Sequence, residues 1–370
     1  MIVKNCSWES FCETIKGKRL IVWGAGRAFE HLISAYKSEA FLNGISYIVD
    51  NNVKGNFQLE NATIRVEPPE KLKNEKACIV LVTSSLYFLE IFDELKTMDL
   101  PDTVEIYFLR CLQLIQSEKL LNDAIRLLNN NKKECIPRII HTFWFSGDPL
   151  PEEYQKCLDS WKKYCPDYEI KIWNQDTYDC GKYGFVKKAI EARKWAFAAD
   201  VARLDVLYEY GGIYMDLDVE IYRPLDSLLC HNGVFSHLDD YIDMPVFASV
   251  KGNELLKKIM ELYDGLEFST DEEYQKNVLI QPRFVKPIFE AEGVPMEEGV
   301  HEVNGNLYLP CNVFLPHYWF DWSGKSKCGD AGYGIHHCNA GWFSDSSREE
   351  RNANIAKVAA LWNRIYEGKE

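Results

Sequence analysis

The sequence predicts an α/β protein of two domains, and three observations support this prediction. The chain has 370 residues, which is enough for two or three domains that each bury their own core. Short apolar strands alternate with helical segments over residues 18–110, a pattern typical of a parallel sheet covered on both faces. The pattern changes after a polar, Asn- and Lys-rich stretch that precedes residue 133. We therefore expect one domain over residues 1–132, including a linker helix, and a second over residues 133–370.

The first domain is expected to be a small Rossmann-like parallel sheet. Apolar strands are predicted at residues 18–24, 45–50, 76–85 and 103–109, and helices at 24–38 and 86–98. Residues 111–134 have the spacing of an amphipathic helix that ends in a polar linker. Helices are predicted after three of the four strands, an alternation typical of Rossmann-like units.

The segment "VWGAGRAF" raises the question of a nucleotide site in this domain. Gly24 and Gly26 lie between a strand and a helix, and Asp50 ends the next strand, where an acidic residue can hold a ribose hydroxyl. Phe29 replaces the third glycine of the usual pattern. With "VDNN" after its second strand, the region resembles the small N-terminal domain of bacterial sugar acyltransferases. Two interpretations stay open: nucleotide binding by Gly24, Gly26 and Asp50, or an inert scaffold.

The second domain is expected to mix strands, helices and aromatic-rich loops. A strand and a glycine turn are predicted over residues 136–147, a helix over 151–166, a strand over 168–177 and helical structure over 185–210. Gly211 and Gly212 should stop that helix and start the next strand. Residues 348–368 have the pattern of an amphipathic C-terminal helix.

The stretch "YGGIYMDLDVEIY" places acidic residues inside an apolar strand pattern. Its alternation predicts one half-buried strand that carries Asp216, Asp218 and Glu220 on a single face. Like charges so close repel each other, and a shared divalent cation would remove that repulsion. Oxygen ligands favour Mg²⁺ or Mn²⁺, which commonly also bind phosphate oxygens of a substrate. Alone, the D-x-D tripeptide is equally compatible with two exposed aspartates at a strand end.

Three blocks in order carry a resemblance to a known family. The segment "FAADVARLDVLYEYGGIYMDLD" is similar to the sugar-binding segment of glycosyltransferase family 32, which includes yeast α-1,6-mannosyltransferases and capsular polysaccharide transferases. The segments "IPRIIHTFWFSGDPLPEEYQKCLDSWKKYCPDYEIKIWNQDT" and "GIHHCNAGW" extend the match, which also covers the glucosyltransferase domains of large clostridial toxins. The resemblance implies a GT-A fold in the second domain and metal-dependent sugar transfer with retention of anomeric configuration.

The resemblance also assigns roles to individual residues. Asp216 and Asp218 correspond to the D-x-D pair, and Asp200 and Arg203 to an Asp-x-x-Arg pair that binds the donor sugar and its phosphate. These four are the expected catalytic residues. The remaining predicted contacts to the donor come from aromatic side chains: Trp144 stacking on the nucleobase, Tyr214 lining the pocket, and Trp342. The alternatives are an ion pair for Asp200 and Arg203 and core packing for the aromatic residues.

The C-terminal block offers a third metal ligand. His337 lies five residues before Trp342, at a place where the toxins have a glutamate, so its assignment beside Asp216 and Asp218 departs from the family pattern. Histidine ligates Mn²⁺ more readily than Mg²⁺. A zinc site built from His336, His337, Cys328 and Cys338 is a further alternative, although its spacing matches no standard zinc finger.

Composition narrows the classes of partner. The net charge of −14 argues against nucleic-acid binding, and twelve scattered cysteines are typical of reduced thiols. Without a signal peptide or apolar span, we expect a cytoplasmic protein, with peripheral association at the inner face of the membrane as an option. The expected partners are a nucleoside-diphosphate sugar and a saccharide acceptor, which a lipid could carry. The competing functions are an NAD(P)-dependent oxidoreductase and a nucleotide-binding scaffold, both based on the N-terminal domain.

Overall fold

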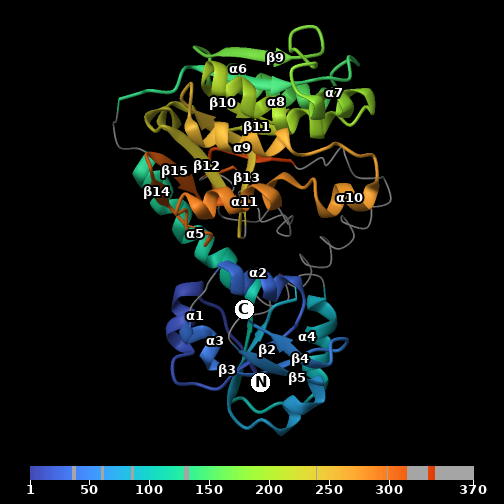
Figure 1. The fold of residues 1–370 in the computed structure, drawn as a ribbon. Helices are drawn as coiled ribbons and strands as arrows, with labels where there is room; N and C mark the ends of the chain where they lie inside the picture. Colours follow the sequence, from blue (N-terminus) through green and yellow to red (C-terminus); the bar gives the residue numbers. More distant parts are fainter. Residues whose placement is uncertain are drawn as a thin grey trace. The chain divides into compact units, whose positions relative to one another are not determined.

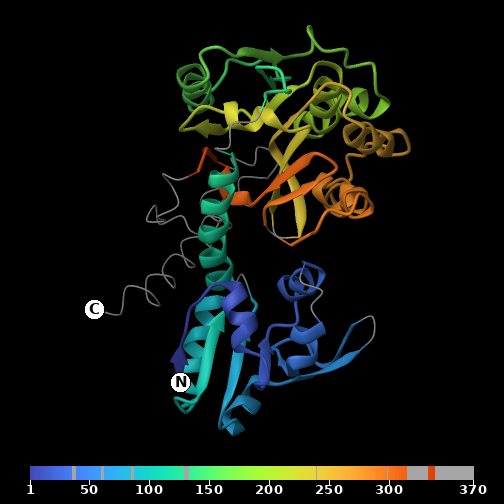
Figure 2. The ribbon, with the colours of Figure 1, turned by 90° about the vertical axis from the view of Figure 1, so that its left-hand side faces the viewer.

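The computed structural model describes residues 1–337 except 36–38, 60–61, 85–86, 129–132, 239, 298 and 315–331. Its described residues form two compact units, 1–119 and 120–337 (Figure 1). The division falls inside α5 (Leu109–Leu128), whereas the sequence suggested a boundary after residue 132. Figure 2 shows α5, in teal, as a continuous helix that follows the last strand of the first unit. The predicted domain bounds stay a prediction.

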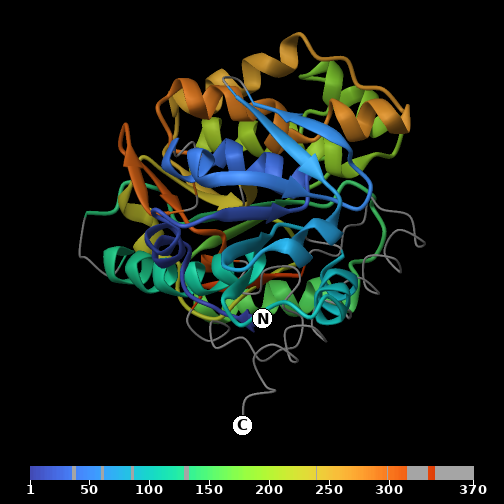
Figure 3. The ribbon, with the colours of Figure 1, turned by 90° about the horizontal axis from the view of Figure 1, so that it is seen from below.

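The first unit is built around a seven-stranded sheet. Its strand order is β1-β7-β6-β2-β3-β5-β4, and every pair is parallel except the β4–β5 hairpin, which Figure 3 shows in light blue. The elements are β1 (Ile2–Val3), α1 (Trp8–Thr14), β2 (Leu20–Trp23), α2 (Arg27–Ala35), α3 (Glu39–Gly44), β3 (Ile45–Val49), β4 (Gly55–Gln58), β5 (Thr63–Glu67), the 3-10 helix η1 (Pro69–Asn74), β6 (Cys78–Val82), α4 (Phe88–Thr97) and β7 (Val104–Phe108).

The central strands of this sheet are apolar because they are buried on both faces. Every residue of β2 and of β6 is buried, as expected for inner strands of a parallel sheet. The four predicted strands are present as β2, β3, β6 and β7. The sequence reading missed β1 and the β4–β5 hairpin, which are short or lie at an edge and lack a long apolar run.

The second unit contains a mixed sheet of seven strands in the order β14-β15-β12-β13-β10-β8-β9, and a separate two-stranded sheet, β11-β16. The elements are β8 (Ile139–Phe143), α6 (Glu152–Tyr164), β9 (Glu169–Trp173), α7 (Gly184–Glu191), α8 (Trp195–Tyr210), β10 (Gly212–Met215), β11 (Val219–Ile221), the 3-10 helix η2 (Asp226–Cys230), β12 (Gly233–Leu238), β13 (Tyr241–Ser249), α9 (Glu254–Asp264), α10 (Glu272–Asn277), α11 (Gln281–Ala291), β14 (His301–Val303), β15 (Asn306–Leu309), the 3-10 helix η3 (Cys311–Val313) and β16 (Gly334–His336). The predicted α/β class is confirmed.

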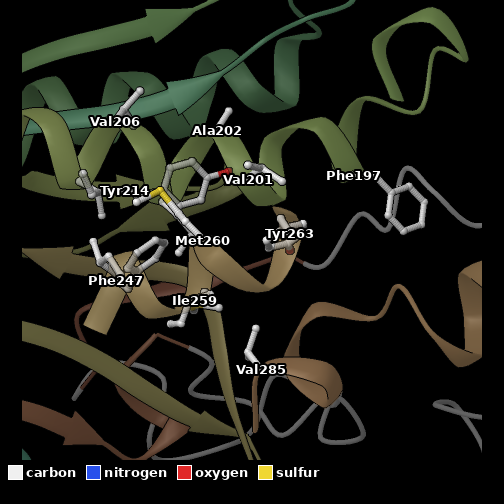
Figure 4. Close-up of a cluster of buried hydrophobic side chains, with 14 of the residues drawn as sticks. Phe197, Val201, Ala202, Val206, Tyr214, Phe247, Ile259, Met260, Tyr263 and Val285 are labelled. Carbon is white, nitrogen blue, oxygen red and sulfur yellow. The ribbon is translucent and has the colours of Figure 1, made fainter. Parts of the chain in front are cut away.

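Helix α8 is a buried helix, and this positions the site. Its apolar residues are distributed around the whole helix and pack against β10, β13 and α9, so a charged residue on it needs a partner. Figure 4 shows Tyr214 of β10 and Phe247 of β13 near Val201 of α8 and Met260 of α9. None of the described helices is both long and apolar enough to cross a membrane.

Two glycines make the turn from α8 into β10. Gly211 has φ of 68° and Gly212 has φ of 118°, both in the region that favours glycine. A Cβ on Gly212 would lie 2.6 Å from the carbonyl oxygen of Ile139, and a Cβ on Gly211 would lie 2.8 Å from the amide nitrogen of Lys251. The glycine pair therefore lets β10 enter the sheet directly beside β8.

Candidate active site

The two aspartates of the D-x-D motif lie in a turn, and the expectation of one continuous strand was wrong. Strand β10 ends at Met215 and β11 begins at Val219. The amide of Val219 donates to the carbonyl of Asp216 at 3.0 Å, which closes the turn, and the amide of Asp216 donates to the carbonyl of Pro245 at 2.8 Å. Because the alternation continues through the turn, the sequence pattern alone does not reveal the break.

Strand β16 brings a histidine to these aspartates. It pairs antiparallel with β11, with His336 opposite Val219 and Gly334 opposite Ile221. His336 Nε2 lies 3.3 Å from Asp218 Oδ1 and 3.8 Å from Asp216 Oδ2. One ligand atom from each of the three side chains lies within 4.8 Å of the others. The described residues therefore present two carboxylates and an imidazole around one point.

The predicted third ligand, His337, lies away from this point. Its Nε2 is 3.2 Å from Glu220 Oε2, and its amide donates to the carbonyl of Asp218 at 2.9 Å. Side chains alternate along a strand, so adjacent histidines point to opposite faces. The structure brings together Asp216, Asp218 and His336, and His337 is the partner of Glu220. Of the alternative zinc ligands, Cys328 and Cys338 lie outside the described residues.

Asp200 and Arg203 form a buried pair next to the turn. They stand three residues apart on α8, and Arg203 Nη2 donates to Asp200 Oδ1. The guanidinium Nη1 donates to the carbonyl of Met244 at 3.2 Å and lies 3.9 Å from Asp216 Oδ1. Arg203 thus connects the Asp-x-x-Arg pair to the D-x-D turn.

Burial changes the proton affinity of these carboxyls. It raises the pKa of Asp200 to about 6, against the opposing effect of Arg203. Burial also raises the pKa of Asp216, an effect that Arg203 and His336 oppose and the negative charge of Asp218 increases. A site that holds such carboxylates close together has a high affinity for positive charge.

Tyr214 positions Asp216. Its hydroxyl donates to Asp216 Oδ1 at 2.6 Å, and its ring packs against Phe247 at 5.6 Å, with the centre of the Arg203 guanidinium 5.5 Å from the ring centroid. Only 2% of Tyr214 is exposed. The side chain therefore packs on the neighbouring strand, as one of the two interpretations expected, and it also orients Asp216. That Tyr214 lines a donor pocket stays a prediction.

Gln281 is a site residue that the sequence reading missed. It begins α11, is 2% exposed, and accepts a hydrogen bond from Arg203 Nη2 through its Oε1 atom. No motif marks it, because "LIQPRF" shows only a proline in the first turn of a helix. His336 was considered only for the zinc alternative, although the alternation of a strand makes either histidine of "IHH" available.

The predicted aromatic contacts have different outcomes. Trp144 is partly buried, packs edge-on against Tyr154 at 5.7 Å, and donates from its indole nitrogen to the carbonyl of Asp148 at 2.7 Å. Its role on a nucleobase stays a prediction. Trp342 lies outside the described residues.

Gly24 and Asp50, two residues of the predicted N-terminal nucleotide site, make close contacts with neighbouring loop residues of the first unit. Asp50 Oδ2 accepts from the amide of Ala25 at 2.8 Å, and Asp50 Oδ1 accepts from the amides of Asn52 and Val53 at 2.8 and 2.9 Å. Gly24 has φ of 117°, and a Cβ there would lie 2.7 Å from Thr83 Oγ1. This geometry gives the glycine and the aspartate of the nucleotide-binding pattern structural roles in the loop.

Comparison with known proteins identifies the central segment. The family described as glycosyltransferase sugar-binding region containing DXD motif matches residues 151–235, which include Asp200, Arg203, Asp216 and Asp218. The chain carries the DXD sugar-binding region of glycosyltransferases. The predicted family resemblance is thereby confirmed for this DXD region, and the comparisons give no support to the oxidoreductase alternative.

Similar proteins include several whose names describe the transfer of mannose to inositol phosphoceramide. Inositol phosphoceramide mannosyltransferase 3 of Schizosaccharomyces pombe is 35% identical over 104 residues, 27% of this chain and 29% of the relative. Mannosyl phosphorylinositol ceramide synthase SUR1 of Saccharomyces cerevisiae is 34% identical over 163 residues, 41% of this chain and 36% of the relative. The chain thus spans about a third of the length of these relatives. Among solved structures, the PaToxG glycosyltransferase covers 67% of this chain and 95% of its own at 16% identity, with a TM-score of 0.36 that is too low to support an argument.

Proposed function

We propose that this protein is a metal-dependent glycosyltransferase that moves a sugar from a nucleoside-diphosphate sugar to a saccharide acceptor with retention of configuration. One observation carries the proposal. Asp216 and Asp218, inside the segment 151–235 that matches a DXD sugar-binding region, lie within 4.8 Å of His336, which lies outside that segment. Arg203, also inside the segment, stands 3.9 Å from Asp216. The cluster and the cation together provide a place for a metal-bound diphosphate in an otherwise acidic protein. A GT-A arrangement of the second unit is part of this proposal.

The donor atoms fit a divalent cation. Ligands about 2.1 Å from an octahedral ion lie about 3 to 4 Å apart, and His336 Nε2 is 3.3 and 3.8 Å from oxygens of the two aspartates. Two carboxylates and an imidazole suit Mn²⁺ better than Mg²⁺. When bound there, the ion would stabilise negative charge on the leaving diphosphate.

The side chains of the site have distinct proposed roles. Arg203 contributes a second positive charge toward the diphosphate, and Asp200 holds the guanidinium through a buried ion pair. Tyr214 keeps Asp216 oriented through its 2.6 Å hydrogen bond. In a retaining reaction without an enzyme nucleophile, the bond between the anomeric carbon and the diphosphate oxygen breaks, and the acceptor oxygen bonds to the anomeric carbon on the same face. The departing phosphate oxygen takes the proton of the acceptor hydroxyl. The groups near the sugar then need to orient the donor rather than form a bond to it.

The names of the relatives support a choice of first substrates. They transfer mannose, and their acceptor is an inositol phosphoceramide. We therefore propose nucleotide-activated mannose as the first donor to test and a lipid-linked or polymeric saccharide acceptor, in the synthesis of a surface glycan.

The test is a screen of UDP- and GDP-sugars for hydrolysis and transfer in the presence of Mn²⁺ and of EDTA. We expect slow hydrolysis of one nucleotide-sugar that depends on the cation and is lost in Asp218→Ala. The anomeric configuration of a transfer product, read by NMR, tests retention. If no nucleotide-sugar is hydrolysed and neither UDP nor GDP raises Tm with Mn²⁺, the proposal is wrong.

A further inference from the structure

We infer that Gln281 is a positioning residue that holds Arg203 toward the donor without neutralising its charge. The inference rests on the proposed function, because it concerns how the Asp-x-x-Arg pair meets a sugar nucleotide. Gln281 lies outside the matched segment 151–235 and about eighty residues after Arg203 in the chain.

The amide of Gln281 is fully engaged at a junction of three helices. Its Oε1 accepts from Arg203 Nη2, and its Nε2 donates to the backbone carbonyl of Asp200 at 2.8 Å and to the hydroxyl of Tyr263 at 2.6 Å. These contacts link α11 to α8 and to the end of α9, where Figure 4 shows Tyr263. Because every N–H of the amide is used and its oxygen faces a guanidinium, the orientation of the side chain is determined by its partners.

Gln281 also completes the support of the guanidinium. Arg203 Nη2 donates to both Asp200 and Gln281, and Nη1 donates to the carbonyl of Met244. Among the described residues, the buried Nε atom has no hydrogen-bond partner. The terminal nitrogens are therefore held by residues of α8, α11 and β13, which fixes the plane of the guanidinium, while the Nε–H and one N–H of Nη1 have no acceptor in the part of the chain that the structure describes.

The chemistry of the site explains why a neutral amide suits this position. A glutamate would accept from Arg203 as well, but it could not donate to the carbonyl of Asp200. It would also add a further negative charge to the carboxylates already near Arg203 and cancel the positive charge that a diphosphate requires. An apolar side chain of the same length would keep the charge of Arg203 but lose its orientation. A glutamine carries no charge, accepts a hydrogen bond from Arg203 and donates one to the carbonyl of Asp200.

Two substitutions separate charge from orientation, and a second buried glutamine provides the control. Gln281→Glu keeps an acceptor for Arg203 and adds a charge, whereas Gln281→Met keeps the shape and removes the hydrogen bonds. Gln275 in α10 is 7% exposed and donates to the carbonyl of Ser269 at 2.8 Å, so Gln275→Glu and Gln275→Met have matched burial without contact to Arg203. Each variant is measured as full-length protein for Tm, for kcat and KM with the nucleotide-sugar found for the wild type, and for the Kd of the free nucleoside diphosphate with Mn²⁺.

We expect Gln281→Glu to raise both KM and the Kd of the nucleoside diphosphate by about tenfold or more, the effect expected for one hydrogen bond to a charged group. Gln281→Met should lower kcat/KM by a similar factor with a smaller change in that Kd. The Gln275 variants should keep wild-type KM and Kd even where Tm falls. If the Gln281 variants do not fold, Tyr263→Phe, which removes one support of the amide, should change kcat/KM in the same direction.

The outcomes distinguish the two proposals. If the wild-type protein turns over no nucleotide-sugar and binds no nucleoside diphosphate with metal, the proposed function fails. If the wild type is active and the folded Gln281 variants, or Tyr263→Phe in their place, keep wild-type KM, kcat and Kd, the positioning role is refuted. Equal effects at positions 281 and 275 would likewise refute it, since only a general loss of packing would then be needed.

Discussion

Replacing Asp218 by asparagine should stabilise the metal-free protein and abolish its response to a divalent cation. The substitution keeps the shape of the side chain and removes one of the two like charges in the turn. It leaves the backbone hydrogen bond from His337 to the carbonyl of residue 218 in place. An asparagine side chain still offers a hydrogen bond to His336 Nε2, which lies 3.3 Å from Asp218 Oδ1. The effect on stability therefore reports mainly on the repulsion between Asp216 and Asp218.

The size of this effect follows from the geometry. The ligand atoms of the two carboxylates lie within 4.8 Å of each other. Two unit charges at that separation repel by about 3 kcal/mol at an effective dielectric constant of about 20. Arg203, 3.9 Å from Asp216, and water reaching the 30% exposed side chain of Asp216 offset most of this repulsion. We expect the free energy of unfolding to increase by about 1 kcal/mol, which raises Tm by about 2–4 °C in a unit of this size.

The assay is thermal unfolding in EDTA and in Mn²⁺. For the wild type, Mn²⁺ at about 100 times its Kd should stabilise the protein by about 2.7 kcal/mol, whereas Asp218→Asn should show no such increase. Asp167→Asn, at an exposed position, serves as the control and should change neither the Tm in EDTA nor the stabilisation by Mn²⁺. A lower Tm for Asp218→Asn in EDTA would refute the argument from repulsion. An unchanged response to Mn²⁺ would refute the metal site.

Three further predictions test other parts of the fold. Burial lowers the pKa of His141 from 6.5 to about 4, so the neutral imidazole stabilises the fold above pH 6.5. This stabilisation, about 3 kcal/mol in total, is lost as the pH falls from 6.5 toward 4. In urea unfolding, the free energy of unfolding should therefore fall more steeply with decreasing pH for the wild type than for His141→Gln. In Gly334→Ala the added Cβ would clash with the backbone carbonyl of Glu220, which should separate β16 from β11, lower the free energy of unfolding by about 1–3 kcal/mol and remove the stabilisation by Mn²⁺. Gly26→Ala, with open space around it, is the control and should leave Tm nearly unchanged. Asp50→Ala should destabilise the first unit by about 2 kcal/mol, because three hydrogen bonds from backbone amides to the carboxylate are lost. NAD should not raise the Tm of the wild type, and a clear rise would contradict a purely structural role for Asp50.

Local sequence predicted the parts of the site that depend on near neighbours. Asp200 and Arg203 pair because residues three apart share a helix face, and charged residues in an apolar helix need a partner. The strands β2 and β6 were predictable because inner strands of a parallel sheet are apolar throughout. The turn at the D-x-D motif was not, since an alternating pattern continues unchanged across a two-residue turn.

Long-range contacts decided the remainder. Asp216 and Asp218 could be read as a pair from the sequence, and the DXD match rests on local residues alone. Whether His336 or His337 joins them depends on the register of β16 against β11, because a shift of one residue along a strand exchanges its two faces. Gln281 reaches Arg203 only because α11 packs where α8 and α9 meet. Residue types and short spacings thus determine which chemistry this protein can perform, whereas the packing of distant segments determines which side chains share the site.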